Sequence, residues 1–258
     1  MPVDRRHNDR ELENPNDRIA CNEPSSIPDG EATMAIMLQA TRQLINRFLA
    51  ATRLKRFGGS SEYWTRRYSK GGDSGPGSYG PFASFKAETI NEFVSRKSIQ
   101  SIIEFGCGDG NQLTLAKYHQ YLGLDISEKA IGMCCERFQA DATKRFQLLS
   151  EYNGEKADAT MSLDVIYHLV EDDVFSRYMN DLFAAASRFV IIYASNTEEL
   201  SAYNSLHVRH RRFSDWIDKN QPEWALAETV PNRYPYQGDH RTGSFADFYF
   251  FERQGFGS

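Results

Sequence analysis

The chain has 258 residues, of which 40% are hydrophobic and 25% charged, and its formal net charge is −5 at pH 7. This composition is typical of a soluble globular protein, and the length accommodates one α/β domain with an extension. The negative charge gives no general attraction for nucleic acid, and no apolar run reaches the ~20 residues that a membrane-spanning helix needs. The first 30 residues lack the apolar core of a signal peptide. The four cysteines lack the spacing of a metal site or a disulfide framework, so we expect free thiols and a cytoplasmic protein.

The first sixty residues are expected to form an extension outside the main domain. Residues 1–30 are rich in charged residues, Asn and Pro, which predicts a disordered tail. Residues 31–60 are predicted to contain a basic amphipathic helix that stops at Gly58. Such a helix either makes a peripheral contact with the inner membrane face, or docks on its own domain or on a second subunit. We favour docking, which includes dimerisation through residues 31–57.

An aromatic and glycine-rich stretch, residues 61–82, opens the main domain of residues 61–258. It reads Ser-Glu-Tyr-Trp-Thr-Arg-Arg-Tyr from Ser61 and continues into a glycine-rich run from Gly71 to Gly80. That run is too flexible to be core, and it suits either a lid over a bound ligand or a plain linker. Its position between two aromatic segments favours the lid. The following residues, 82–96, are predicted to form a helix that packs on the sheet.

The stretch from Ser101 to Asp125 organises the rest of the chain. A short apolar run that ends at Glu104 is typical of a buried parallel strand. Glycines follow at alternate positions, and glycines suit a turn whose backbone presses against a ligand; they are Gly106, Gly108 and Gly110. A helix is predicted over Gln112–His119. A second strand then ends in Asp125, the position at which an acid typically holds a ribose diol.

The remaining elements alternate between helix and strand. Ser127 is expected to cap a helix that runs to about Phe138. Strands are predicted at 146–149, 159–165, 189–193, 224–230 and 245–252, and helices at 172–186 and 213–220. This alternation predicts an α/β protein with a doubly wound, mostly parallel sheet.

Two cofactor classes use a glycine turn of this kind. Dinucleotide-binding proteins place a third glycine or alanine where this chain has Asn111. The order Glu-Phe-Gly-Cys-Gly-Asp-Gly, followed by Asp125 at the tip of the next strand, resembles motif I of the class I S-adenosylmethionine (SAM)-dependent methyltransferases. The resemblance covers about Tyr63–Glu252. It implies SAM as the cofactor and a seven-stranded sheet of order 3-2-1-4-5-7-6 with an antiparallel seventh strand. A nicotinamide-dependent oxidoreductase is the rival enzyme class.

The resemblance also implies a set of cofactor-binding residues. Asp125 is expected to hold the ribose, Arg67 to grip the methionine carboxylate through paired hydrogen bonds, and Glu151 to lie near the adenine. The full set is Trp64, Arg67, Glu104, Gly106, Cys107, Gly108, Gly110, Asp125, Ile126, Glu151 and Asp164.

Three histidines are candidates for the base that removes a proton from the acceptor. His168 follows the fourth predicted strand, in Asp-Val-Ile-Tyr-His-Leu, at the sheet edge where reacting groups meet. We assign it as the catalytic base. His207 and His210, a His-x-x-His pair in a loop, are the rival bases. Asp164 and Asp239 are too isolated to predict a metal site, and no metal is expected.

The expected acceptor is a hydroxyl of a small molecule or glycan. Tyrosines and histidines suit a polyhydroxylated acceptor such as a sugar, and the expected contacts are Tyr79, Tyr167, His207 and His210. No basic groove interleaved with aromatics is evident, which disfavours nucleic acid. The motifs from Tyr-Trp to Asp-Val-Ile-Tyr-His-Leu also resemble bacterial methyltransferases associated with surface glycans. The alternative function is a catalytically inactive SAM-binding adaptor.

Overall fold

The structure, a computed structural model, describes residues 34, 36, 41, 57–199 and 205–255. The chain divides into two compact units, residues 1–50 and 51–258. In the first unit only Met34, Ile36 and Thr41 are described, and all three are helical. The tail predicted at 1–30, and most of the helix predicted within 31–60, therefore lie outside the described residues. No helix within the described residues has both the length and the apolar composition needed to cross a bilayer.

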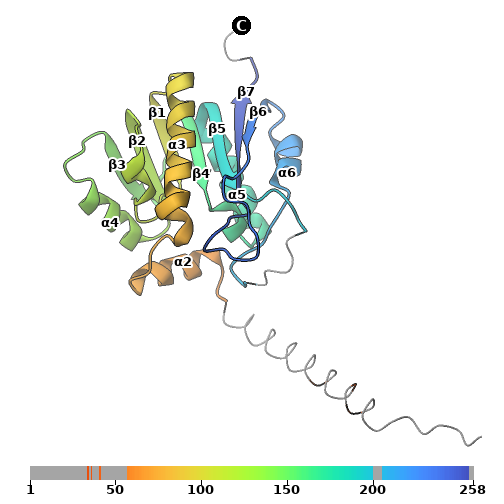
Figure 1. The fold of residues 1–258 in the computed structure, drawn as a ribbon. Coiled ribbons are helices and arrows are strands. Elements are labelled where there is room, and N and C mark those ends of the chain that lie inside the picture. The colour runs from red at the N-terminus through yellow and green to blue at the C-terminus, as the bar shows by residue number, and fades with distance from the viewer. Residues whose placement is uncertain (1–33, 35, 37–40, 42–56, 200–204, 256–258) are drawn as a thin grey trace, which may run out of the picture. The chain divides into compact units, whose positions relative to one another are not determined.

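The second unit is built on a seven-stranded sheet of order β3-β2-β1-β4-β5-β7-β6 (Figure 1). The strands are parallel, except that β7 is antiparallel to both of its neighbours. The predicted strand order and the antiparallel seventh strand are therefore confirmed. The strands are β1 Ser101–Phe105, β2 Gln120–Asp125, β3 Lys144–Leu148, β4 Ala157–Leu163, β5 Ala186–Ala194, β6 Trp224–Val230 and β7 Asp247–Arg253.

Helices cover both faces of this sheet, and α2 lies across one of its ends (Figure 1). Residues of α3 and α4 join the buried cluster on one face, and residues of α5 and α6 join the cluster on the other. The helices are α2 Ser60–Ser69, α3 Gly80–Lys97, α4 Glu128–Arg137, α5 Asp172–Ala185 and α6 Phe213–Asn220. The cap predicted for α4 is present, because the Ser127 hydroxyl accepts a hydrogen bond from the Ala130 amide at 3.3 Å.

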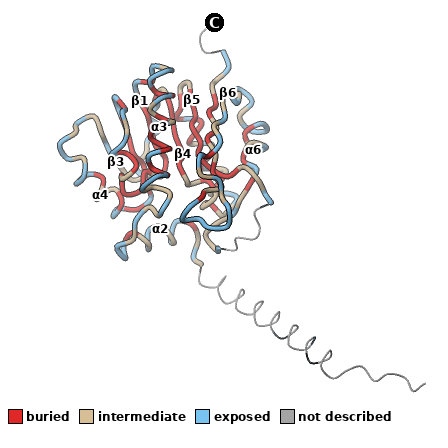
Figure 2. Tube along the Cα trace, in the orientation of Figure 1, coloured by how far each residue is buried: buried red, intermediate tan, exposed pale blue. Residues whose placement is uncertain are grey.

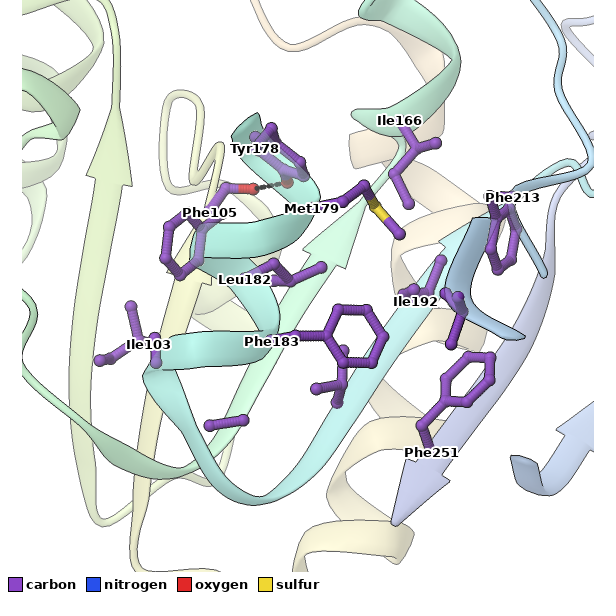
Figure 3. Close-up of a cluster of buried hydrophobic side chains, with 14 of the residues drawn as sticks. Ile103, Phe105, Ile166, Tyr178, Met179, Leu182, Phe183, Ile192, Phe213 and Phe251 are labelled. Atoms are coloured by element: carbon purple, nitrogen blue, oxygen red, sulfur yellow. Dashed lines mark hydrogen bonds between the residues drawn. The ribbon is translucent and has the colours of Figure 1, made fainter. Parts of the chain in front are cut away.

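The central strands are buried along most of their length and are mainly apolar, because helices cover both faces of the sheet (Figure 2). Ile102 belongs to the cluster beneath α3, and its neighbour Ile103 to the cluster beneath α5. The α5 cluster is drawn in Figure 3, where the Tyr178 hydroxyl donates to the Phe105 carbonyl at 2.8 Å. Phe183 is fully buried at the centre of this cluster.

The helix predicted at Gln112–His119 is wrong. The chain makes a single 3-10 turn over Gln112–Leu115 and is already extended at Ala116. Asn91 of α3 explains the early stop: its side-chain amide donates to the Leu115 carbonyl at 2.9 Å and accepts from the Lys117 amide at 2.9 Å. Backbone groups that would continue the helix are thereby bonded to α3 instead.

Strand boundaries also differ from the prediction by one to three residues in β3, β4, β5 and β7. β4 ends at Leu163 rather than at 165, because Asp164 takes a left-handed backbone conformation with φ of 61°. β7 begins at Asp247 rather than at 245. The left-handed residue after β4 turns the chain into a short 3-10 helix, Ile166–His168, which carries the proposed base.

Candidate active site

A cavity of about 260 Å³ lies at the carboxyl ends of β1, β2 and β4. This is the edge at which open α/β sheets bind their ligands. The glycine turn forms one wall, α2 and the lid segment (residues 71–80) contribute a second, and α5 contributes a third.

The glycine turn needs its glycines for both conformation and space. Gly106 has φ of 86° and Gly108 has φ of 59°, values that residues with a Cβ rarely adopt. A Cβ on Gly106 would lie 2.5 Å from the Val165 side chain, and a Cβ on Gly108 would lie 2.3 Å from the Ser74 hydroxyl. Both residues line the cavity, as Cys107 does, whereas Gly110 packs against Cys134 and does not line it.

Two buried carboxylates line the cavity beside this turn. Burial raises the pKa of Glu104 to about 7, although a hydrogen bond from the Tyr121 hydroxyl at 2.5 Å opposes the shift. Burial likewise raises the pKa of Asp125, while backbone amides oppose the shift. Its two oxygens accept from the Gly108 amide at 3.0 Å and the Ser127 amide at 2.9 Å. Asp125 therefore holds the turn in place and still has lone pairs for a ligand.

The lid segment is hydrogen-bonded to the glycine turn. Asp109 accepts from the Ser74 amide at 2.9 Å and from the Tyr79 hydroxyl at 2.7 Å, and its own amide donates to the Ser74 hydroxyl at 3.0 Å. The Asn111 side chain donates to the Ser78 carbonyl at 2.7 Å. Burial works against ionisation of Asp109, but its hydrogen bonds hold its pKa below the usual value. The segment is therefore anchored to the cavity wall, and its role as a lid stays a prediction.

His168 lines the cavity with one ring nitrogen already engaged. Its Nδ1 lies 3.0 Å from the His207 carbonyl oxygen, and because a carbonyl only accepts, Nδ1 carries the proton. The Trp64 ring meets the His168 ring edge-on at 4.8 Å. Ser60, at the start of α2, is held by the Glu171 carboxylate at 2.6 Å, which fixes α2 and hence Trp64 over this site.

The His168 ring is neutral near pH 7. Burial lowers its pKa to about 4, although the hydrogen bond to the His207 carbonyl opposes the shift. The neutral ring, protonated at Nδ1, keeps a lone pair on Nε2. A neutral ring with a free lone pair can accept a proton, and its lowered pKa makes it a weaker base than an ordinary histidine.

Several residues predicted for cofactor or substrate binding lie outside the cavity wall. Arg67 donates from Nε to the Asp73 carbonyl at 2.6 Å and pairs with the Asp73 carboxylate at 2.9 Å. Glu151 is exposed in the 3-10 turn after β3, and Leu149 of the same turn lines the cavity in its place.

The predicted substrate contacts also point their polar groups elsewhere. The Tyr79 hydroxyl donates to Asp109, and the Tyr167 hydroxyl donates to Asp164 at 2.7 Å. The His207 ring stacks on Tyr63 at 4.1 Å, and His210 Nδ1 meets the Ser195 hydroxyl at 2.6 Å. None of Tyr79, Tyr167, His207 or His210 belongs to the cavity wall. Trp64, Ile126 and Asp164 do line it, as predicted.

Lys86 and Gln112 are two of the polar lining residues that the sequence did not predict. Lys86 is fully buried on α3, with its ammonium 2.7 Å from the Asp164 carboxylate. Lys86 stands four residues after Phe82 and four before Ile90, so it shares their apolar face of the helix. A lysine on such a face could have indicated a buried, functional charge. Gln112 donates to the Ala83 carbonyl at 3.0 Å, while its buried Oε1 has no partner among the described residues.

The site fits SAM in charge and in hydrogen-bonding groups. Five carboxylates line the cavity against two cationic side chains, an excess that suits a sulfonium; the carboxylates are Glu104, Asp109, Asp125, Asp164 and Asp181. Asp125 offers acceptors for a diol, and the orphaned Gln112 Oε1 offers one for an ammonium. No cluster of three His, Cys, Asp or Glu side chains suited to a metal ion occurs in the part of the chain that is described.

Residues 103–190 match a family model described as a methyltransferase domain. The N-methyltransferase NodS from Bradyrhizobium japonicum WM9, solved with S-adenosyl-L-homocysteine (SAH), is 16% identical over 76% of this chain and 99% of its own, with a TM-score of 0.58. The magnesium protoporphyrin IX methyltransferase from Synechocystis PCC 6803, with bound SAH, is 18% identical over 66% of this chain and 83% of its own, with a TM-score of 0.52.

The methyltransferase domain of bacterial CtHen1-C is 19% identical over 66% of this chain and 97% of its own, with a TM-score of 0.52. A search of curated proteins gave no significant match. The sheet order, the glycine turn and the family match over residues 103–190 agree with one another. Together they show a class I methyltransferase fold, in which residues 103–190 match the methyltransferase domain family.

Proposed function

We propose that this chain is a SAM-dependent methyltransferase that acts on a hydroxyl group of a small molecule or glycan, with His168 as the base. The observation that carries the proposal is the neutral His168 ring on the cavity wall, with Nδ1 bonded to the His207 carbonyl. An amine acceptor that is already unprotonated needs no base, whereas a hydroxyl loses a proton as it attacks. A ring with a free Nε2 lone pair therefore suits a hydroxyl.

The geometry of the wall supports proton removal at Nε2. Trp64 and the His207 carbonyl fix the ring from two sides, so the lone pair keeps one direction. Bound SAM supplies an electrophilic methyl group on a positively charged sulfur. The acidic lining stabilises that charge, and the acceptor proton moves to His168 Nε2 as the oxygen attacks. The hydrogen bond at Nδ1 then stabilises the imidazolium that forms.

The charge of the cavity favours a neutral acceptor. With carboxylates in excess over cations, a polyanion such as RNA would meet net repulsion in the wall. The two lining cations, Lys86 and Arg177, are both paired with acids, Asp164 and Asp173. Trp64 offers an apolar face of the kind on which sugar and aromatic rings pack.

The proposal is tested by supplying the full chain with SAM carrying a labelled methyl group. The acceptor panel contains neutral mono- and oligosaccharides, phenols, primary amines and single-stranded RNA, and SAH release and label transfer are both measured. We expect label on a neutral hydroxyl compound, with the product identified as a methyl ether by mass and NMR. Label confined to amines or to RNA would overturn the hydroxyl proposal.

A matched pair of variants links the activity to the site. His168→Gln should lower turnover about 10²-fold. His119→Gln, at an exposed histidine outside the cavity, should leave it unchanged. SAH binding without methyl transfer to any member of the panel would favour the inactive adaptor instead.

A further inference from the structure

The ion pair between Lys86 and Asp164 is buried at the wall of the cavity. Lys86 is 1% exposed, and its ammonium lies 2.7 Å from Asp164 Oδ2 and 5.3 Å from the centre of the Tyr193 ring. α3 points Lys86 inward because Phe82, Lys86 and Ile90 occupy the same buried face of the helix. Both members of the pair line the cavity.

The fold does not require a charged pair at this position. Two buried charges lose their hydration, and apolar residues of similar volume generally serve stability at least as well. Asp164 adds backbone strain, because it is a non-glycine residue with φ of 61°. Charges and strain that coincide at a cavity wall are typical of a functional site.

The Lys86 ammonium retains donors for a ligand. It has three N–H groups, and the structure records one hydrogen bond for it among the described residues, to Asp164. The Asp164 carboxylate accepts from Lys86 and from the Tyr167 hydroxyl and keeps further lone pairs. The buried Gln112 Oε1, which has no partner in the described part of the chain, belongs to the same wall.

Two cationic side chains line the described cavity and could bind a ligand carboxylate. Besides Lys86 the wall contains only Arg177 among the described residues, and the Arg177 side chain is 72% exposed and paired with Asp173. Arg67, which the sequence had suggested for this role, is bonded to Asp73 outside the wall. Lys86 is therefore the buried cation that a carboxylate inside the cavity can reach.

We propose that Lys86 and Asp164 together hold the amino-acid end of SAM. That end is a zwitterion, and an ion pair presents one group of each sign to it: Lys86 Nζ donates to the α-carboxylate, and the Asp164 carboxylate accepts from the α-ammonium. Gly77 of the lid segment packs against this pair, since a Cβ there would lie 3.0 Å from Asp164 Oδ2. A closed lid thus covers the amino-acid end. The assignment rests on the cofactor but not on the identity of the acceptor.

The test compares ligands that differ only at the amino-acid end. Calorimetry measures binding of SAH, of decarboxylated SAH, which keeps the amine, and of 5′-deoxy-5′-methylthioadenosine, which lacks the whole amino acid. Wild type should bind SAH at least tenfold more tightly than decarboxylated SAH. Lys86→Met should weaken SAH binding by at least tenfold and change methylthioadenosine binding less than threefold. No acceptor is present, so an acceptor carboxylate cannot produce this pattern.

Controls separate a ligand contact from a structural role. Lys97→Met removes another lysine of α3, one paired with Glu252, and should alter none of the three affinities. Lys86→Gln, which keeps a donor for Asp164, serves the same comparison if Lys86→Met fails to fold. Equal losses for SAH and methylthioadenosine would overturn the proposal, as would equal binding of SAH and decarboxylated SAH to wild type. Failure of wild type to bind any of the three ligands would instead refute the cofactor itself.

Discussion

Glu104→Gln isolates the cost of keeping a carboxyl group buried beside the glycine turn. The pKa of Glu104 in the folded chain is about 7, against an ordinary value of 4.5. Between these values the folded state holds a proton that the unfolded state has released, so stability falls as the pH rises. The full penalty, reached above pH 7, is about 3 kcal/mol, since one pKa unit corresponds to about 1.4 kcal/mol.

The measurement is urea unfolding of wild type and Glu104→Gln at several pH values from about 5 to 8. Glutamine still accepts the Tyr121 hydrogen bond, so packing changes little. The difference in unfolding free energy should shift by roughly 2 to 3 kcal/mol in favour of the variant across that range. A difference that stays constant with pH would refute the raised pKa of Glu104.

Three further predictions address the cofactor, the base and the core. Asp125→Ala should weaken SAH binding at least tenfold, because a buried diol without its acceptor loses about 1 to 3 kcal/mol; unchanged affinity by calorimetry would remove Asp125 from the site. Turnover should stay level from pH 8 down to about pH 5 and fall only below it, because the neutral base forms above the His168 pKa of about 4. A fall centred near 6.5 would contradict that value. Phe183→Ala should cost about 3 to 5 kcal/mol in chemical unfolding, because Phe183 is fully buried against Trp224 and, as Figure 3 shows, near Phe251. A loss below 1 kcal/mol would contradict tight packing there.

The sheet was predictable because each central strand must bury two faces. Ile102 and Ile103 contact opposite layers, so an unbroken apolar run, rather than an alternating one, marked a parallel strand. The glycine turn was predictable for a similar reason. Its residues need positive φ and little volume, and glycine alone meets both needs at Gly106 and Gly108.

The wall of the site was harder to predict because it depends on which partners meet in space. Lys86 and Asp164 are 78 residues apart, and a single lysine in a helix is ordinarily solvated at the surface. An arginine can bind a ligand carboxylate, which is why Arg67 was predicted to do so. In the structure Arg67 is hydrogen-bonded to Asp73, only six residues away, instead. The prediction of a helix after the glycine turn was wrong for a similar reason. Asn91 of α3 is hydrogen-bonded to the Leu115 carbonyl and the Lys117 amide, which a longer helix would have used.

Anchoring the lid segment to the glycine turn has a kinetic consequence. Four hydrogen bonds join Asp109 and Asn111 to residues 74–79, and each contributes about 1 kcal/mol to holding the segment in place. Asp109 lines the cavity, so the predicted lid is hydrogen-bonded to the cavity wall itself. If residues 71–80 act as the predicted lid, SAH can leave only after these hydrogen bonds break, and the rate at which they break would set an upper limit on turnover.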